Sequence, residues 1–586
     1  MFNVMAEIDK VINKYGIEKE KYLKVHIEQL MGEILQEAVS KYGKRVIIRG
    51  LKATKSEIHP FLSFVSRYMD IVGIQEQTLQ ENGFIFVSSE KKVPILPLSD
   101  KIVDCDIYLI NALISGQGIK YEMEGHLKEN KIAAVDIYFE LKQRYGVALG
   151  KSYDFYDREY DCTSKRIKDA MEKDRVERTE GSLKNLLGQC LCIGDFTSFF
   201  RIENEETERI NYSEELKQLI YDVKQLIKRI KGAVEERKYK FGGRKDIVWH
   251  WIDSINYDEI GLLPRVEKRI KKGMFFSEAY SPTPYTRPTV RTIFWREFRR
   301  KDGGKKGAYV PRRLTDSNLY QEIIRQGYHF EVCGSVKKII DPAYELAEES
   351  ELCTAASMYY LRMLHTILMS EKPCFVLVHV MAETHMPFVS PWENIKGGGY
   401  MYSDVWEKVE EKINISAEYA DAVIDFYSEL LDQQSIGIYM SDHGKWGFIE
   451  RRRYKDESIH ILLGITNIGI AGNVSRLFSY EKFDCLVQWI LQLNKNSVDE
   501  MLFGDMEIYS EGYKGSARKQ KGDIEDICTG FVGINTTEDK YVVLDNGKEY
   551  YFLKEEKESI NRIEEEKYYN RIIYLKEKLS KSTDYS

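Results

Sequence analysis

Short apolar segments that run directly into polar residues are the feature that most constrains the fold of this chain. The segment IVWHWI at 247–252 ends in Asp253, and GIYM at 437–440 runs straight into the sequence SDHG. From residue 245 to about residue 500, such segments alternate with helical patterns, which is typical of an α/β domain. In open α/β sheets the ligand groups lie at the carboxyl ends of the strands. We therefore expect these polar residues to gather into one site.

The SDHG sequence is the sharpest local signal. Asp442 and His443 are adjacent, and Gly444 permits a tight turn. A mixed set of oxygen and nitrogen ligands suits a divalent cation, so we predict a metal site here. Asp253 has two interpretations from its own surroundings, a metal ligand or the N-cap of the segment that follows. His250, inside the apolar segment, is expected to be packed in the core.

The loop SPTPYTRPT at 281–289 is stiffened by prolines and presents the hydroxyl of Thr286 just before a predicted helix at 289–298. Arg287 and Arg291 add positive charge nearby. A helix N-terminus with basic neighbours favours an anion. The same pattern also fits a proline-stiffened turn with threonine caps, so the loop alone does not decide between the two.

A third polar group follows the apolar run VLVHV. His379 lies inside this run, and Glu383 and His385 follow before a proline. Two histidines and a carboxylate at the end of a strand could bind a metal or an oxyanion, and they could equally be structural residues. His460, in the next apolar run SIHILLGI, is a further candidate.

The chain before residue 245 predicts two other units. Short apolar runs alternate with helical stretches over the first 150 residues, which suggests a parallel, Rossmann-like sheet. The loop after the first run, Gly50-Leu-Lys-Ala-Thr, lacks the glycine pattern that brings backbone amides against a pyrophosphate. We therefore favour the interpretation that this domain is a degenerate Rossmann scaffold used for docking over the interpretation that it binds a dinucleotide. The predicted domains are a Rossmann-like α/β domain at 1–150, a helical connector at 151–240 and a catalytic domain at 241–586.

Composition excludes several partners. Lys and Arg number 86 against 93 Asp and Glu, a net charge of −7, which argues against nucleic acid or an anionic membrane as the main partner. The nine cysteines are scattered and form no CxxC pair. The start lacks the apolar run of a signal peptide, and no stretch of about 18 apolar residues occurs. We expect a cytoplasmic protein with no membrane span.

Taken in order, the four motifs resemble the sulfatase-like branch of the alkaline phosphatase superfamily. The resemblance covers about residues 245–570 and includes VHVMAETHMPF, similar to the family's H-x-x-x-x-x-H-x-P-[YF] pattern, and SDHG. The tail at 533–561 resembles the family's closing hairpin and its E-x-Y-[DN]-L and E-x-x-N run, here Glu549, Tyr551, Leu553, Glu558 and Asn561. The resemblance implies a mostly parallel central sheet with a small C-terminal antiparallel sheet.

The resemblance also implies roles for individual residues. Asp253, Asp442 and His443 would bind one divalent metal (manganese, magnesium, calcium or zinc), with Thr286 as both ligand and nucleophile. His385 would bind the oxyanion and Arg287 would assist catalysis. The implied substrate-binding residues are His379, Lys445 and Arg291.

The chain departs from sulfatases at the nucleophile. Sulfatases oxidise a Cys or Ser in a C/S-x-P-x-R motif to formylglycine, whereas the secondary carbinol carbon of Thr286 cannot give that aldehyde, and Val290 replaces the Arg. The first metal motif has one Asp followed by Ser254, where many sulfatases have two Asp. Both changes are similar to lipoteichoic acid synthases and phosphoethanolamine transferases, which carry membrane anchors, whereas no membrane-spanning stretch is expected in this sequence. No second Asp-x-x-x-His set is found, which favours one metal.

These features imply a metal-dependent phosphotransferase or phosphodiesterase with a covalent Thr286 intermediate. The expected substrate is a phosphorylated or sulfated glycan, an envelope precursor or a lipid-linked small molecule. Two alternatives stay open: a sulfuric ester hydrolase of the same fold, and a non-catalytic scaffold that binds an anion or a glycan.

Overall fold

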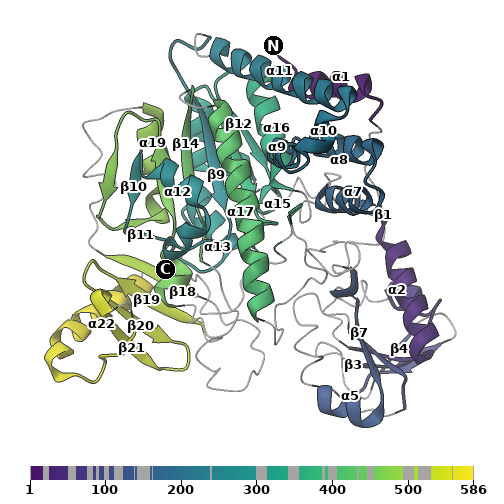
Figure 1. The fold of residues 1–586 in the computed structure, drawn as a ribbon. Coiled ribbons are helices and arrows are strands. Elements are labelled where there is room, and N and C mark those ends of the chain that lie inside the picture. Colours follow the sequence, from purple (N-terminus) through teal and green to yellow (C-terminus); the bar gives the residue numbers. More distant parts are fainter. Residues whose placement is uncertain are drawn as a thin grey trace.

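The computed structural model describes most of the chain. The described residues are 2–17, 25–49, 61–75, 83–86, 91–97, 104–110, 120, 123–137, 139–141, 159–160, 163–237, 240–297, 313–334, 336–340, 355–385, 388, 390–392, 406–431, 434–444, 454–492, 507–512, 530–556 and 558–584. They form three sheets of four or more strands, each with its own hydrophobic cluster, and a layer of helices (Figure 1).

The largest sheet has seven strands in the order β12-β13-β9-β14-β15-β10-β16. The first four strands of that order are parallel, β15 is antiparallel to both of its neighbours, and β16 is parallel to β10. Every residue of β9, β13 and β14 is buried, because helices cover both faces. The bounds are β12 (His329–Cys333), β13 (Cys374–Val380), β9 (Asp246–Ile252), β14 (Ser435–Met440), β15 (Leu463–Thr466), β10 (Met274–Phe276) and β16 (Gly472–Val474).

The side chains of the central strands alternate between two hydrophobic clusters. Val248 and Ile252 of β9 join the cluster that holds α12 (Pro264–Ile270), α16 (Ala356–Met369) and α17 (Trp406–Leu431). Trp249 and Trp251 point to the opposite cluster. That second cluster contains side chains of α13 (Thr286–Trp295), α14 (Asn318–Arg325), α15 (Lys337–Ile340) and α19 (Phe483–Gln492). The domain is therefore a three-layer α/β structure.

A helical layer extends the first cluster away from the sheet. The predicted apolar stripe of α11 (Glu214–Arg237) is buried at Leu216, Leu219, Ile220, Val223, Leu226 and Ile230, and Ile227 is partly buried. α1 (Val4–Lys14) packs against α8 (Glu180–Cys192) and α11, so it lies in this layer and not with the predicted Rossmann-like unit. The apolar face of α1 decides this, because it is complementary to these helices. The remaining members are α7 (Thr163–Glu177), α8 (Glu180–Cys192), α9 (Phe196–Glu205) and α10 (Thr207–Asn211).

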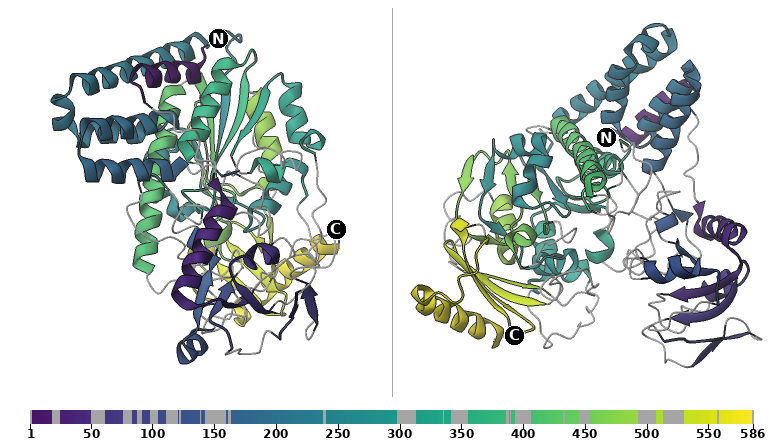
Figure 2. Two further views of the ribbon diagram at one scale, coloured as in Figure 1. Left: turned by 90° about the vertical axis from the view of Figure 1, so that its right-hand side faces the viewer. Right: turned by 60° about the horizontal axis from the view of Figure 1, so that its bottom comes forward.

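The N-terminal sheet is wholly parallel, with the strand order β3-β2-β6-β7. Its strands are β2 (Arg45–Arg49), β3 (Asp70–Gln75), β6 (Ile107–Ile110) and β7 (Ala133–Asp136), and α2 (Ile27–Tyr42) and α5 (Glu124–Asn130) accompany them (Figure 2). A hairpin of β4 (Phe84–Phe86) and β5 (Lys92–Pro94) was not expected from the sequence. A two-residue ribbon pairs β1 (Val25–His26) with β8 (Glu159–Tyr160). The loop at 50–54 lies outside the described residues.

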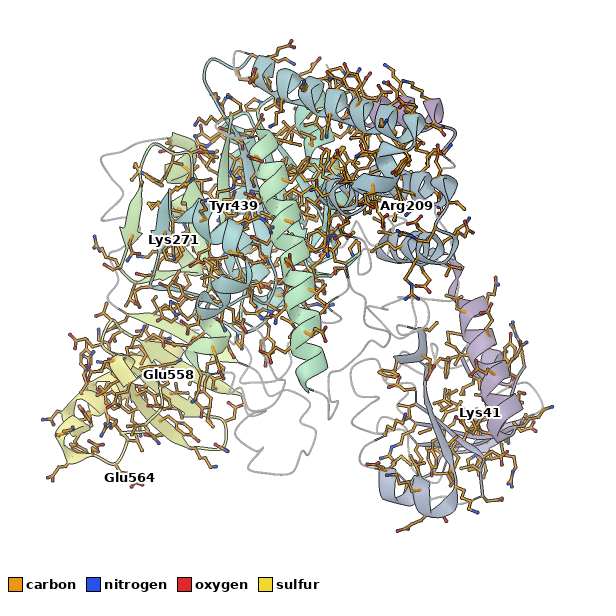
Figure 3. All side chains as sticks on the ribbon, in the orientation of Figure 1. Lys41, Arg209, Lys271, Tyr439, Glu558 and Glu564 are labelled. Carbon is orange, nitrogen blue, oxygen red and sulfur yellow. The ribbon has the colours of Figure 1, made fainter. Side chains whose placement is uncertain are left out.

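The C-terminal sheet is antiparallel and is packed on one face by α22 (Tyr569–Asp584). Its strands are β18 (Ile508–Gly512), β19 (Phe531–Asn535), β20 (Asp539–Leu544) and β21 (Glu549–Leu553). Glu558, labelled in Figure 3, accepts a hydrogen bond from the backbone N–H of Asp456 at 2.7 Å and pairs with the buried Lys540 at 2.6 Å. This tail motif thus fastens the small sheet to the domain that contains the seven-stranded sheet.

The expected fold class is confirmed: a mostly parallel central sheet between helices, with a small antiparallel sheet at the C-terminus. Among the helices that the structure describes, none has the length and apolar character that crossing a bilayer requires.

Candidate metal and nucleophile site

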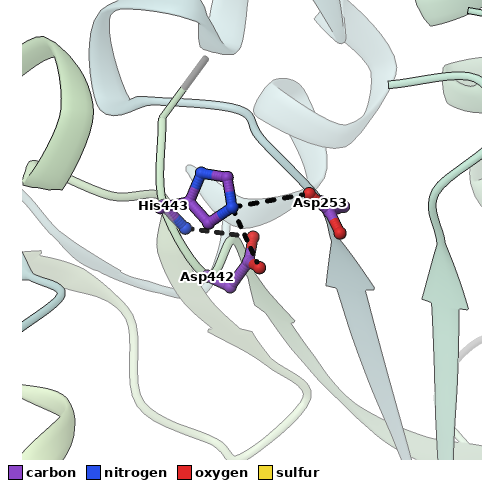
Figure 4. Close-up of side chains that lie close together, drawn as sticks. All are labelled: Asp253, Asp442 and His443. Carbon is purple, nitrogen blue, oxygen red and sulfur yellow. Dashed lines mark hydrogen bonds and ion pairs between the residues drawn. The ribbon is translucent and has the colours of Figure 1, made fainter. Parts of the chain in front are cut away.

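Two neighbouring strands deliver the predicted metal ligands to one point. β9 and β14 are parallel and paired, with Trp251 opposite Met440, so the residues that follow them emerge side by side. Asp253 comes after β9, and Asp442 and His443 come after β14. One ligand atom from each of these three lies within 4.8 Å of the others (Figure 4). The structure therefore brings together the residues that the strand-end pattern predicted.

The cluster is closed to solvent and tightly connected. Asp253 and His443 are each 1% exposed, and Asp442 is fully buried. His443 Nε2 lies 3.4 Å from Asp442 Oδ2 and 3.8 Å from Asp253 Oδ1. Two buried carboxylates and an imidazole face one another, which is an arrangement that a cation would stabilise.

Ser254 links the two carboxylates. Its hydroxyl donates to Asp253 Oδ1 at 2.7 Å, and its backbone N–H donates to Asp442 Oδ1 at 3.2 Å. Ser254 has a left-handed backbone with φ of 61°, which is uncommon for a residue with a side chain and turns the N–H toward Asp442. The sequence showed Ser254 only as the absence of a second Asp, and its bridging role was missed.

The backbone fixes opposite tautomers on two histidines. His443 Nδ1 lies 2.7 Å from the carbonyl oxygen of Gly444, so Nδ1 carries the proton and Nε2 presents a lone pair to the carboxylates. His379 Nδ1 accepts from the backbone N–H of Val336 at 3.2 Å, so its Nε2–H donates to Asp253 Oδ2 at 3.1 Å. His443 is thus prepared to bind a metal, whereas His379 orients a ligand.

The two carboxylates differ in acidity. Burial would raise the pKa of Asp253, but the neighbouring His385, the hydrogen bond from His379 and the nearby His443 outweigh this effect and hold that pKa well below its ordinary value. Burial and the charge of Asp253 raise the pKa of Asp442. The pair therefore concentrates negative charge that the described protein groups only partly neutralise.

These residues fit a divalent cation. Asp442 Oδ2 is buried and has no hydrogen-bond partner within the part of the chain that the structure describes. An orphaned carboxylate oxygen beside a second carboxylate and an imidazole lone pair is the donor set expected for a small divalent ion. Asp253, Asp442 and His443 could hold it.

Thr286 stands at the edge of this cluster. It is the first residue of α13, and its hydroxyl lies 3.2 Å from His443 Nε2 and 3.5 Å from Asp253 Oδ2. The predicted helix begins three residues earlier than expected, so the hydroxyl and the N-terminal N–H groups of α13 share one location. A negative charge that develops at this point is favoured by the helix dipole.

The other predicted site residues fall into different settings. His385 is half-buried and close enough for its charge to lower the pKa of Asp253. Arg287 is exposed on the first turn of α13. Arg291 forms an ion pair with Glu297 at 2.6 Å. Lys445 lies outside the described residues.

Two histidines from apolar runs lie in packed surroundings. His250 is stacked on Tyr439, with ring centroids 4.2 Å apart, and its Nδ1 lies 2.7 Å from the Tyr360 hydroxyl. His460 lies between Tyr257 and Tyr280, with centroid distances of 4.3 and 4.7 Å. Both are structural in these contacts.

Comparison with known proteins gives structural neighbours only. No family model and no curated protein matches the chain. Among solved structures, a 2-O GAG sulfatase is similar at 11% identity, covering 58% of this chain and 92% of that chain with a TM-score of 0.45. A phosphonate monoester hydrolase from Silicibacter pomeroyi is similar at 12% identity, covering 58% and 95%, with a TM-score of 0.43.

A third structure, of a protein in complex with its substrate D-glucosamine-2-N,6-O-disulfate, is similar at 12% identity, covering 58% of this chain and 98% of that chain with a TM-score of 0.43. The structural neighbours found in this way thus include sulfatases and phosphonate monoester hydrolases.

Proposed function

We propose that this chain is a metal-dependent hydrolase or transferase that acts on phosphate groups, chiefly phosphodiesters, through a covalent intermediate on Thr286. The observation that carries the proposal is the position of the Thr286 hydroxyl, 3.2 Å from His443 Nε2 and 3.5 Å from Asp253 Oδ2, at the N-terminus of α13. A nucleophile, its activating groups and a dipole that favours anions then meet at one place.

Each site residue has a proposed role in binding the cation, orienting its ligands or contacting the substrate. Asp253, Asp442 and His443 hold the cation, and His379 and Ser254 orient them. A divalent cation in this position lowers the pKa of a bound hydroxyl and stabilises negative charge on the transferring group. His385 and Arg287 are proposed to contact the phosphate oxygens, and Lys445, His379 and Arg291 stay candidates for substrate binding.

The reaction balances in two steps. Thr286 Oγ1 loses its proton and attacks phosphorus, so the Oγ1–P bond forms, the bond from phosphorus to the leaving oxygen breaks, and the leaving oxygen takes up a proton. Water or a glycan hydroxyl then attacks the same phosphorus. The Oγ1–P bond breaks, and Thr286 regains a proton. The proposed substrate is a glycan or envelope precursor that carries such an ester, and the proposed location is the cytoplasm.

A substitution series at Thr286 tests the proposal. Wild type, Thr286→Ala and Thr286→Ser are assayed with an aryl phosphodiester in the presence of manganese, magnesium, calcium or zinc. We expect turnover by wild type, partial turnover by Thr286→Ser and none by Thr286→Ala, with equal melting temperatures. Full activity of a folded Thr286→Ala variant would overturn the proposal.

A sulfuric ester hydrolase with the same residues is the second candidate. It is favoured by the same nucleophile and metal geometry, because a sulfate ester is also an anion attacked at a tetrahedral centre. The same variants assayed with an aryl sulfate separate the two. Preference for the sulfate identifies a sulfatase, and inactivity on both substrates in a metal-loaded protein identifies a non-catalytic anion-binding scaffold.

A further inference from the structure

Thr289 lies one helical turn after the proposed nucleophile and contacts both halves of the site. It is fully buried. Its hydroxyl oxygen lies 2.9 Å from the carbonyl oxygen of Tyr285, which directly precedes Thr286, and 3.3 Å from the carbonyl oxygen of the metal ligand Asp442. A hydroxyl has one proton, so the two carbonyl groups share it.

A second buried hydroxyl, that of Ser281, contacts the Thr289 hydroxyl. Ser281 Oγ lies 3.1 Å from Thr289 Oγ1 and also donates to the carbonyl of Thr283 at 2.8 Å. The Ser281 N–H donates to Ile459 O at 2.8 Å, which ties this chain of hydroxyls to the main body of the domain. The start of α13 is thus linked to α18 (Asp456–Ile459) through Ser281 and to the segment after β14 through the bond from Thr289 to Asp442.

Thr292 offers a contrast on the same helix. It is also buried, and its hydroxyl donates to the carbonyl of Pro288, four residues back, at 3.1 Å. Its other acceptor is the carbonyl of Glu297 at 3.5 Å, so its bonds stay within the α13 segment. Thr289 and Thr292 are therefore both buried threonines whose hydroxyl bonds to the carbonyl oxygen four residues earlier. Of the two, only Thr289 also bonds to the carbonyl oxygen of Asp442.

We propose that Thr289 is a positioning residue that sets the distance between the nucleophile Thr286 and the metal ligand Asp442. The inference rests on the proposed function and deepens it. Reacting groups must be held within a fraction of an ångström, and a misplacement of about 1 Å can reduce turnover by about 100-fold. Residues that orient metal ligands typically change metal affinity by about 10- to 100-fold. Removing the shared proton frees α13 and the Asp442 loop to shift relative to each other.

The test compares Thr289→Val, which keeps the shape and removes the hydroxyl, with Thr289→Ser and with Thr292→Val. Manganese affinity is measured by calorimetry, and kcat and KM are measured with an aryl phosphodiester. We expect Thr289→Val to lower kcat by about 10- to 100-fold at little-changed KM and to weaken manganese binding by about 10-fold or more. Thr289→Ser should restore both, and Thr292→Val should resemble wild type.

Equal kcat and equal manganese affinity in Thr289→Val and Thr292→Val would overturn the inference. If wild type binds manganese but turns over no substrate, the proposed function fails, and the calorimetric comparison still decides the positioning role. A wild type that binds no metal overturns both. If Thr289→Val does not fold, Thr289→Ala carries the same test because it also removes the hydroxyl, with lowered kcat or weakened metal binding supporting the inference and wild-type values contradicting it.

Discussion

The substitution Asp442→Asn separates the proposed metal-binding role of Asp442 from its role in the fold. Asp442 Oδ1 accepts from the backbone N–H groups of Ser254 at 3.2 Å and His443 at 3.0 Å, and an amide oxygen can keep both bonds. The new amide nitrogen would replace the unpartnered Oδ2, 3.4 Å from the lone pair of His443 Nε2. The variant should fold and lose the cation site.

The magnitude follows from the two facing carboxylates. Charges within 4.8 Å repel by about 3 kcal/mol at an effective dielectric constant near 20. Asp442→Asn removes this repulsion, so we expect the substitution to stabilise the metal-free protein by up to about 3 kcal/mol. In wild type, a cation at 100 times its Kd adds about 2.7 kcal/mol. For a domain of about 340 residues this corresponds to a rise in Tm of about 4 °C.

The assay is thermal unfolding with and without manganese, for wild type, Asp442→Asn and Asp421→Asn. Asp421 is a buried carboxylate that accepts from the N–H groups of Arg265 and Val266, at the start of α12, and it is not part of the metal cluster. Wild type and Asp421→Asn should gain Tm with manganese, and Asp442→Asn should not. A retained manganese response in Asp442→Asn, or a lowered Tm of that variant without metal, would refute the reasoning.

Two further predictions concern groups outside the metal cluster. Lys540 is 1% exposed and pairs with Asp456 at 2.9 Å and Glu558 at 2.6 Å, so Lys540→Met should lower the free energy of unfolding by about 3–5 kcal/mol. Lys576→Met breaks a more exposed pair between α22 and Glu549 of β21 and should lower that free energy by less than about 1 kcal/mol; equal losses in urea titrations would contradict this. Burial raises the pKa of Glu383 to about 8 from an ordinary 4.5, so its contribution to stability is complete below pH 4.5 and is lost as pH rises through 8. Glu383→Gln should reduce the fall of the unfolding free energy with pH by up to about 1.4 kcal/mol per pH unit, as measured by urea unfolding from pH 5 to 9. If the variant shows the same slope of unfolding free energy against pH as wild type, Glu383 is not the source of that decline.

The metal cluster could be predicted because its geometry is a consequence of strand topology. Two apolar segments that become adjacent parallel strands must end at the same edge of the sheet. Asp253, Asp442 and His443 therefore lie close together because of the strand pairing, independently of the conformation of the loops. Thr286 was harder, because it follows the two-residue strand β11 (Ala279–Tyr280) and reaches the site only through the turn before α13. For Thr286 the family resemblance was needed beside the local pattern.

Other features depend on contacts that no local pattern encodes. The orienting role of His379 comes from the backbone N–H of Val336, 43 residues away. The role of Ser254 comes from a left-handed φ that is unusual for serine. α1 is amphipathic in sequence, but only the matching faces of α8 and α11 determine where it packs.

The most direct test of the central claim is mass spectrometry of protein quenched during turnover. Wild type with manganese and an aryl phosphodiester is acid-quenched, digested and searched for a phosphoryl adduct. We expect an adduct on the peptide that contains Thr286, formed and lost at rates consistent with turnover, and no adduct in Thr286→Ala. Steady turnover without an adduct, or an adduct on a different residue, would contradict it.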